Sequence, residues 1–87
     1  MSEAREAAIL ASADRYRDVC LEHEAAELML AETSGAWRLA VERDDWSSPE
    51  AKAAHAARDA ANAEVQRLCR ERVEALKALG EAARVGR

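Results

Sequence analysis

Two long stretches of this sequence contain no residue that breaks a helix. Residues 4–32 include neither Gly nor Pro, and no Gly follows Pro49 until Gly80. Stretches of this length without Gly or Pro favour two long helices, because these residues most often end a helix. The chain also has 22 Ala but only five Val, one Ile and one Thr, which is too few β-branched residues for a sheet. We therefore predict an all-α fold.

The start of the second helix is the clearest local signal. Ser48 is a good N-cap, Pro49 suits the first helical position, and Glu50 favours the positive end of the helix dipole. Ser47 and Glu50 also have the spacing of a capping box. These residues predict one domain over 1–87, with a helix at about 3–45, a turn at 46–48 and a helix at about 49–84.

Gly35 leaves two alternatives for the first helix. The helix either continues through Gly35, straight or with a kink, or ends near Glu32 and is followed by a short helix over 36–45. A Gly inside a helix costs only about 1 kcal/mol relative to Ala, so we expect the continuous helix.

Folding the chain at 46–48 gives an antiparallel two-helix hairpin in which facing residues have numbers that add up to about 94. Trp37, Leu39 and Val41 then face the alanines between 53 and 61, and bulky side chains opposite small ones allow close packing. In the same register Leu28 and Leu30 face Val65, Leu21 faces Val73, and Tyr16 faces Leu79. An apolar stripe with three- and four-residue spacing follows the second helix. It consists of Ala54, Ala57, Ala61, Val65, Leu68, Arg72, Leu76 and Leu79. We expect the charge of Arg72 to pair with Glu24 or Glu27 and so to fix the register.

The apolar surface of the first helix is wider than one neighbouring helix covers, and a hairpin rich in Ala buries little area. We therefore expect a homodimer or higher oligomer that completes a four-helix bundle, related to coiled coils. The residues expected at partner or oligomer interfaces are Tyr16, Leu21, Leu28, Leu30, Trp37, Trp46, Val65, Leu68, Arg72, Leu76 and Leu79.

The charge distribution limits the classes of partner. The net charge is −4, with −6 on residues 1–46 and +2 on residues 47–87, so nucleic-acid binding is disfavoured. No apolar run is long enough to span a membrane, and the N-terminus lacks the apolar region of a signal peptide. The two cysteines are expected to be reduced thiols in the cytoplasm.

Two His–carboxylate pairs have the spacing of one helix face: His23 with Glu27, and His55 with Asp59. They are weak candidates for metal ligands, because the hairpin register separates the pairs and the chain has no Glu-x-x-His. Cys20 precedes His23 by three residues, but no Gly-rich loop accompanies it as an oxyanion site. We expect no metal, no cofactor and no enzymatic activity.

Trp46 lies at the predicted turn, where it either covers the end of the bundle or anchors a partner. A helical hairpin of about this length with Trp at its turn resembles the WXG family of type VII secretion substrates. The sequence Trp46-Ser47-Ser48 lacks that family's Gly two residues after Trp, and no Tyr follows in the C-terminal tail. The resemblance implies a secreted helical hairpin.

The leading functional hypothesis is a non-enzymatic helical interaction or assembly module. It would self-associate and dock onto a larger protein complex, for example in a bacterium or a phage. One alternative is a small acidic inhibitor or regulator that binds a target protein. The other is the secreted WXG-like hairpin.

Overall fold

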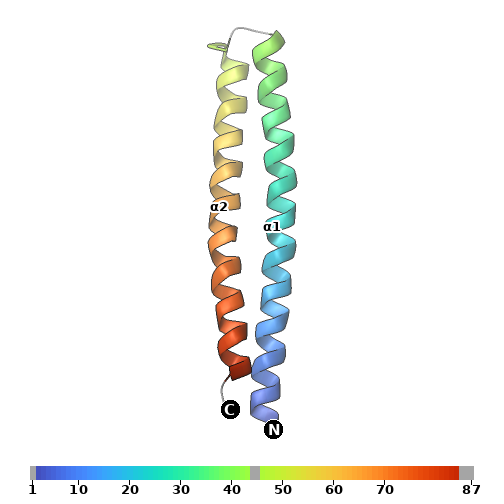
Figure 1. The fold of residues 1–87 in the computed structure, drawn as a ribbon. Helices are drawn as coiled ribbons and strands as arrows, with labels where there is room; N and C mark the ends of the chain where they lie inside the picture. The colour runs from blue at the N-terminus through green and yellow to red at the C-terminus, as the bar shows by residue number, and fades with distance from the viewer. Residues whose placement is uncertain (1, 44–45, 85–87) are drawn as a thin grey trace.

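The computed structural model describes residues 2–43 and 46–84 of the chain. Two helices make up all of the regular structure in these residues: α1, Glu3–Arg43, and α2, Pro49–Arg84 (Figure 1). The helices run antiparallel, so the start of α1 and the end of α2 lie at the same end of the hairpin. The predicted all-α hairpin is thus observed. Residues 44 and 45, predicted to end the first helix, lie outside the described residues.

Serine side chains cap the beginning of both helices. The Ala51 N–H donates to Ser48 Oγ (3.1 Å), and the Lys52 N–H donates to the Ser48 carbonyl oxygen (3.0 Å). At the start of α1 the Arg5 N–H donates to Ser2 Oγ (3.2 Å). Each serine therefore satisfies an N–H group that has no partner within its own helix.

Helix α1 is continuous through Gly35. The hydroxyl of Thr33 donates to the carbonyl oxygens of Met29 (2.9 Å) and Leu30 (3.1 Å), so this polar side chain is satisfied by its own helix. The alternative in which the first helix ends near Glu32 is wrong.

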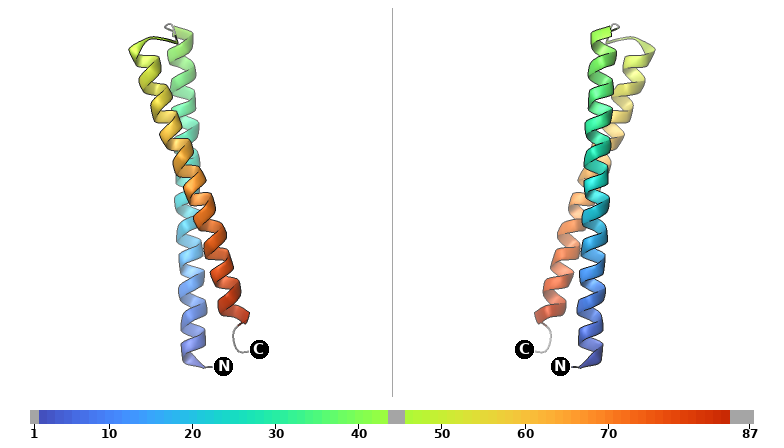
Figure 2. Two further views of the ribbon diagram at one scale, coloured as in Figure 1. Left: turned by 90° about the vertical axis from the view of Figure 1, so that its left-hand side faces the viewer. Right: turned by 90° about the vertical axis from the view of Figure 1, so that its right-hand side faces the viewer.

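The contact between the helices follows a heptad pattern on both sides, with buried or half-buried residues at alternating spacings of three and four. We call this set of residues the seam. On α1 the seam consists of Arg5, Ile9, Ser12, Tyr16, Val19, His23, Ala26, Leu30, Thr33, Trp37 and Ala40. On α2 it consists of Ala51, Ala54, Arg58, Ala61, Val65, Leu68, Arg72, Ala75, Leu79 and Ala82. A heptad repeat makes helices wrap around each other, and Figure 2 shows α1 and α2 crossing near the middle of their length.

Large side chains face small ones along the seam. The two heptads align when the numbers of facing residues add up to 91, which places Leu30 opposite Ala61 and Trp37 opposite Ala54. The contacts across the seam agree with this register, since they join Arg5 with Ala83 and Trp37 with both His55 and Arg58. The register differs by three residues from the predicted value of about 94.

The structure also covers a different face of each helix from the one expected. Leu21, Leu28, Leu39 and Leu76 were all expected between the helices, but their side chains are more than half exposed. On α2, Arg58 and Ala75 occupy the seam where Ala57 and Leu76 were expected. Alanines lie both in the seam of α2 and on its exposed side, so their positions do not mark which side faces α1.

The hairpin is a thin rod whose Cα atoms extend over 63 × 14 × 13 Å. Its radius of gyration is 19.2 Å, whereas a compact domain of this length has about 12 Å. Its accessible surface is 6344 Å², against about 5,000 Å² for a typical monomer of this mass. No helix in the described part of the chain has a stretch long and apolar enough to cross a membrane.

Candidate functional site

A line of exposed leucines lies on the side of α1 that faces away from α2. We call Leu10, Leu21, Leu28 and Leu39 the leucine face; their exposed fractions are 65, 56, 68 and 57%. Their spacings of 11, 7 and 11 residues put them on one line, because 18 residues make about five turns of an α-helix. The seam lies on the opposite side of α1, so α2 cannot cover this line. Four leucines in a row are more than the isolated apolar residues that occur on any surface.

The residues beside the leucine face carry both signs of charge. Arg17 Nη2 lies 3.7 Å from carboxylate oxygens of Asp14 and Asp18, and all three side chains are more than 60% exposed. Ion pairs this exposed contribute little to stability. The surroundings of the leucines are thus polar, as at the rim of a protein–protein interface.

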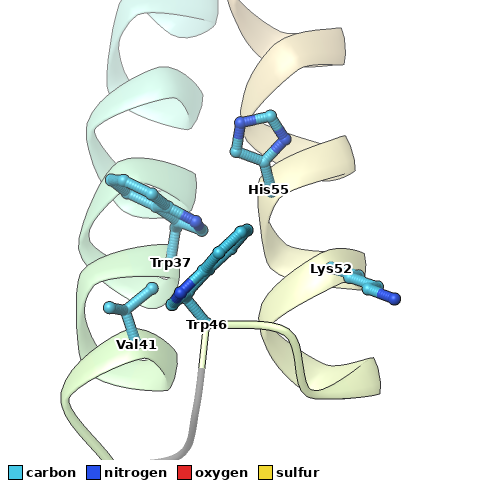
Figure 3. A pocket seen from close by; sticks show the side chains of 5 residues that line it. All are labelled: Trp37, Val41, Trp46, Lys52 and His55. Atoms are coloured by element: carbon cyan, nitrogen blue, oxygen red, sulfur yellow. The ribbon is translucent and has the colours of Figure 1, made fainter.

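A second apolar site lies between the helices at the turn end of the rod. Trp37, Val41, Trp46, Lys52 and His55 line an open cleft of about 460 Å³, the tryptophan cleft. Figure 3 shows the Trp46 ring in the space between the helices and the Trp37 ring against α1, with the amino group of Lys52 directed away. Trp46 is 73% exposed, so it does not cover the end of the hairpin in the way a buried lid would. Trp46 is therefore available to a partner.

Side chains of α2 contact Trp37 on the inner side of this cleft. The Trp37 and His55 rings meet edge to face, with centroids 5.8 Å apart, and the Arg58 guanidinium lies 4.9 Å from the centre of the Trp37 ring. His55 Nδ1 lies 3.3 Å from an Asp59 carboxylate oxygen. Trp37 is thus fixed on the seam side by two side chains of α2, while Trp46 lies on the open side.

A shallower hollow of about 440 Å³ occurs near the end of α2. Its apolar part consists of Val73, Leu76 and Leu79, and Lys77 and Arg84 lie at its edge. It is exposed on the surface of a single helix, which makes it a weaker candidate than the tryptophan cleft.

The two His–carboxylate pairs form as their spacing predicted, but they do not meet. His23 Nδ1 lies 2.8 Å from Glu27 Oε1, and His23 is only 8% exposed. His55 is thirteen residues along α2 from the position that faces His23, or about 20 Å. Within residues 2–43 and 46–84, no three His, Cys, Asp or Glu side chains come together to hold a metal ion.

Both thiols are free, and Cys20 belongs to a small polar group at the seam. A hydrogen bond with Cys20 raises the pKa of Tyr16, the charge of Cys20 and partial burial act in the same direction, and the guanidinium of Arg72 lowers it. Arg72 thus lies near Tyr16. The expected ion pair of Arg72 with Glu24 or Glu27 does not occur among the described residues; Glu27 pairs with His23 instead.

The strongest ion-pair group lies on the outer surface of α2. Arg67 donates to Glu64 through two nitrogens and to Glu71 through a third, at 2.7 Å for the last of these. The hydrogen bond from Arg67 lowers the pKa of Glu64, and it raises the pKa of Arg67 in turn. All three side chains are neighbours on one exposed helix face, so they stabilise α2 rather than form a pocket.

The expected interface residues fall into four places. Leu68 is 2% exposed in the seam, and Tyr16, Leu30, Trp37, Val65, Arg72 and Leu79 are half-buried beside it. Leu21 and Leu28 lie on the leucine face, and Trp46 lies in the tryptophan cleft. Leu76 lies on the outer side of α2.

The sequence reasoning missed Leu10 and Leu39 as interface residues. The signal that identifies them is the 18-residue repeat, since Leu10 and Leu28 share one position and Leu21 and Leu39 share the other. A single exposed leucine carries no such information, but two pairs at five helical turns do.

Comparison with known proteins gives no further assignment of these sites. No family model matches the chain, and neither a curated protein nor a solved structure matches it significantly.

Proposed function

We propose that this protein is a non-enzymatic helical interaction module that self-associates through the leucine face of α1. The observation that carries this proposal is the line of four leucines, each more than half exposed, on the side of α1 away from α2. Each leucine that a partner covers is worth about 1.5–3 kcal/mol when burial is complete. A second copy supplies the same apolar surface, as homodimer interfaces do.

The accessible surface supports the same proposal. The hairpin exposes about 1,300 Å² more than a typical monomer of its mass. A stable interface buries about 1,200–2,000 Å² in total over both partners. If each of two copies covers half of its excess surface, the interface buries about 1,300 Å² in total, which is enough for a stable dimer.

Static light scattering of Leu21→Glu/Leu28→Glu tests the proposal. We expect the unmodified chain to have twice the mass of 9.5 kDa, and the double variant to lose this association because buried carboxylates are costly. Leu76→Glu is the matched control, since Leu76 is also a half-exposed leucine but lies on α2. A monomeric unmodified chain at all concentrations, or a double variant that dimerises like the control, would overturn the proposal.

We further propose that the tryptophan cleft docks the module onto a larger protein assembly by receiving an apolar side chain. Two indoles around an open cleft suit such an anchor, because aromatic residues dominate interface hot spots. The acidic N-terminal half favours a protein over a nucleic acid as the partner. Two free thiols suit the cytoplasm of a bacterium or of a phage-infected cell.

Trp46→Ala tests the docking proposal. We expect its helicity and self-association to be unchanged, since Trp46 is exposed, and the binding of the native assembly to be lost. Met29→Ala is the control, because Met29 is an exposed apolar residue of α1 outside both sites. Equal recovery of the assembly by both variants would contradict a docking role for the cleft.

A further inference from the structure

The leucine face has the same spacing in both directions along α1. Leu10 and Leu39 have numbers that add up to 49, and so do Leu21 and Leu28. We propose that two copies of this chain pack α1 against α1 antiparallel, with a two-fold axis passing between Glu24 and Ala25. This arrangement faces Leu10 with the partner's Leu39 and Leu21 with the partner's Leu28. The inference rests on the proposed function, because it takes self-association through the leucine face and specifies its geometry.

Charged residues between the leucines decide between the two orientations of the partner. In a parallel pair, each charged residue would face the same residue of the partner. Like charges would then repel at four positions, Asp14, Arg17, Glu24 and Glu32. The antiparallel pair instead faces Arg17 with the partner's Glu32, and Glu24 with the partner's Ala25. Two-fold symmetry makes both pairings occur twice.

Arg17 can change partners at little cost. Its two contacts within α1 are each 3.7 Å long and lie at exposed carboxylates, Asp14 and Asp18. An ion pair of this kind contributes little in water, and its strength rises where a partner excludes solvent. The partner's Glu32 therefore adds to the charge around Arg17 without the loss of a strong bond.

The length of α1 suits this register. Helix α1 extends over Glu3–Arg43. With a two-fold axis between residues 24 and 25, residues 6–43 of one copy therefore lie alongside residues 6–43 of the other. The helix–helix contact is then about 57 Å long. Since the seam and the leucine face lie on opposite sides of α1, the four helices form a row with the two α1 helices inside and one α2 on each side. The predicted four-helix bundle would accordingly be flat rather than square.

Disulfide formation between single cysteines tests the register directly. The background chain carries Cys20→Ala and Cys69→Ala, and circular dichroism verifies its helicity. Ala25→Cys lies at the two-fold axis, so we expect two copies of this variant to form a disulfide with each other. Leu10→Cys alone forms none, because the two thiols are about 44 Å apart. Leu10→Cys mixed with Leu39→Cys forms a disulfide between the two variants. Ala63→Cys, an exposed alanine of α2, is the matched control.

The expected cross-links form at least about tenfold faster than that of the control, because adjacent thiols have millimolar effective concentrations. A Leu10→Cys homodimer would show a parallel pair and overturn the inference, while self-association through the leucine face would stand. Rapid cross-linking of Ala63→Cys would place α2 in the interface and overturn both. A background chain that is monomeric by light scattering overturns the proposed function, and the inference falls with it.

Exchanging two charges gives an independent measurement. We expect Arg17→Glu and Glu32→Arg each to weaken the dimer about fivefold, as two partly exposed ion pairs would. The double variant Arg17→Glu/Glu32→Arg restores the affinity. Residues 17 and 32 are about 22 Å apart within one helix, so restoration requires contact between two chains. A double variant weaker than either single variant would exclude the proposed register.

Discussion

Three arginines occupy the seam, where a coiled coil normally has apolar residues. Arg5 Nη2 donates to the Ala83 carbonyl oxygen (2.9 Å), at the end of α2 where carbonyl groups lack helical partners. The Arg58 guanidinium lies over the Trp37 ring. Arg72 lies near Tyr16. Each long side chain thus leaves its stem in the seam and carries its charge to a polar group, an aromatic ring or the surface.

Arg72 has the least favourable of these three environments, since its neighbour Tyr16 is neutral at pH 7. We expect Arg72→Leu to stabilise the hairpin by about 1 kcal/mol, because leucine fills the seam without a charge to desolvate. The melting temperature then rises by about 4–8 °C at fixed protein concentration. The pKa of Tyr16 also rises further, because the guanidinium that lowers it is gone.

Thermal denaturation and an ultraviolet pH titration measure these two changes. Tyr16 is the one Tyr of the chain, so the titration reports on it alone. Arg70→Leu serves as the control, because Arg70 is exposed outside the seam and should change neither value. If the melting temperature of Arg72→Leu were unchanged or lower, Arg72 would have a stabilising contact in the seam.

At the scale of the helices, Gly35 and Gly80 weaken otherwise strong helix formers. A Cβ atom at either position would meet no atom within 4 Å. We expect Gly35→Ala and Gly80→Ala each to stabilise the protein by about 0.5–1 kcal/mol, because alanine restricts the unfolded chain without crowding the folded one. Their effects should add, since the sites are far apart.

Urea denaturation of both variants measures these increments. In the proposed antiparallel dimer Gly35 would face the partner's Asp14, and the added methyl group is small enough to leave association unchanged. A destabilised Gly35→Ala with a stabilised Gly80→Ala would mean that α1 needs a glycine at this position.

The two helices themselves could be predicted from the sequence because their ends carry strong local signals. Ser48 and Pro49 fixed the start of α2, and the Ser48 cap is present in the structure. The buried face of α2 was harder to predict. The sequence predicted a stripe through Ala57 and Leu76, whereas the seam runs through Arg58 and Ala75. Burial of an alanine yields little free energy, so the alanines of α2 do not decide between these two stripes.

The same reasoning explains which parts of the candidate sites were predicted. His23 and Glu27 paired as expected, because a spacing of four residues fixes their separation on a helix. Leu39 was assigned to the wrong face, because no local signal fixes which side of α1 faces α2. The seam runs through Trp37 and Ala40, which leaves Leu39 on the surface.

For the whole molecule, the thin rod buries little apolar surface, so the self-association proposed above would add much of its stability. Only six apolar residues are buried among those described, and four of them are alanines. A core of this size supplies little of the several kcal/mol that a folded domain needs. The leucine face adds four large apolar side chains, each more than half exposed, on the other side of α1. The surface that binds a second copy would therefore also be part of what keeps the chain folded.

This coupling predicts that the melting temperature depends on protein concentration. A dimer that dissociates on unfolding is stabilised by mass action, and a tenfold higher concentration raises the melting temperature by about 4 °C for a chain of this size. Leu21→Glu/Leu28→Glu should melt at a lower temperature that no longer changes with concentration. Leu76→Glu should keep the dependence of the unmodified chain. A concentration-independent melting temperature in the unmodified chain would show that the seam suffices for folding, and that the leucines are exposed for some purpose other than self-association.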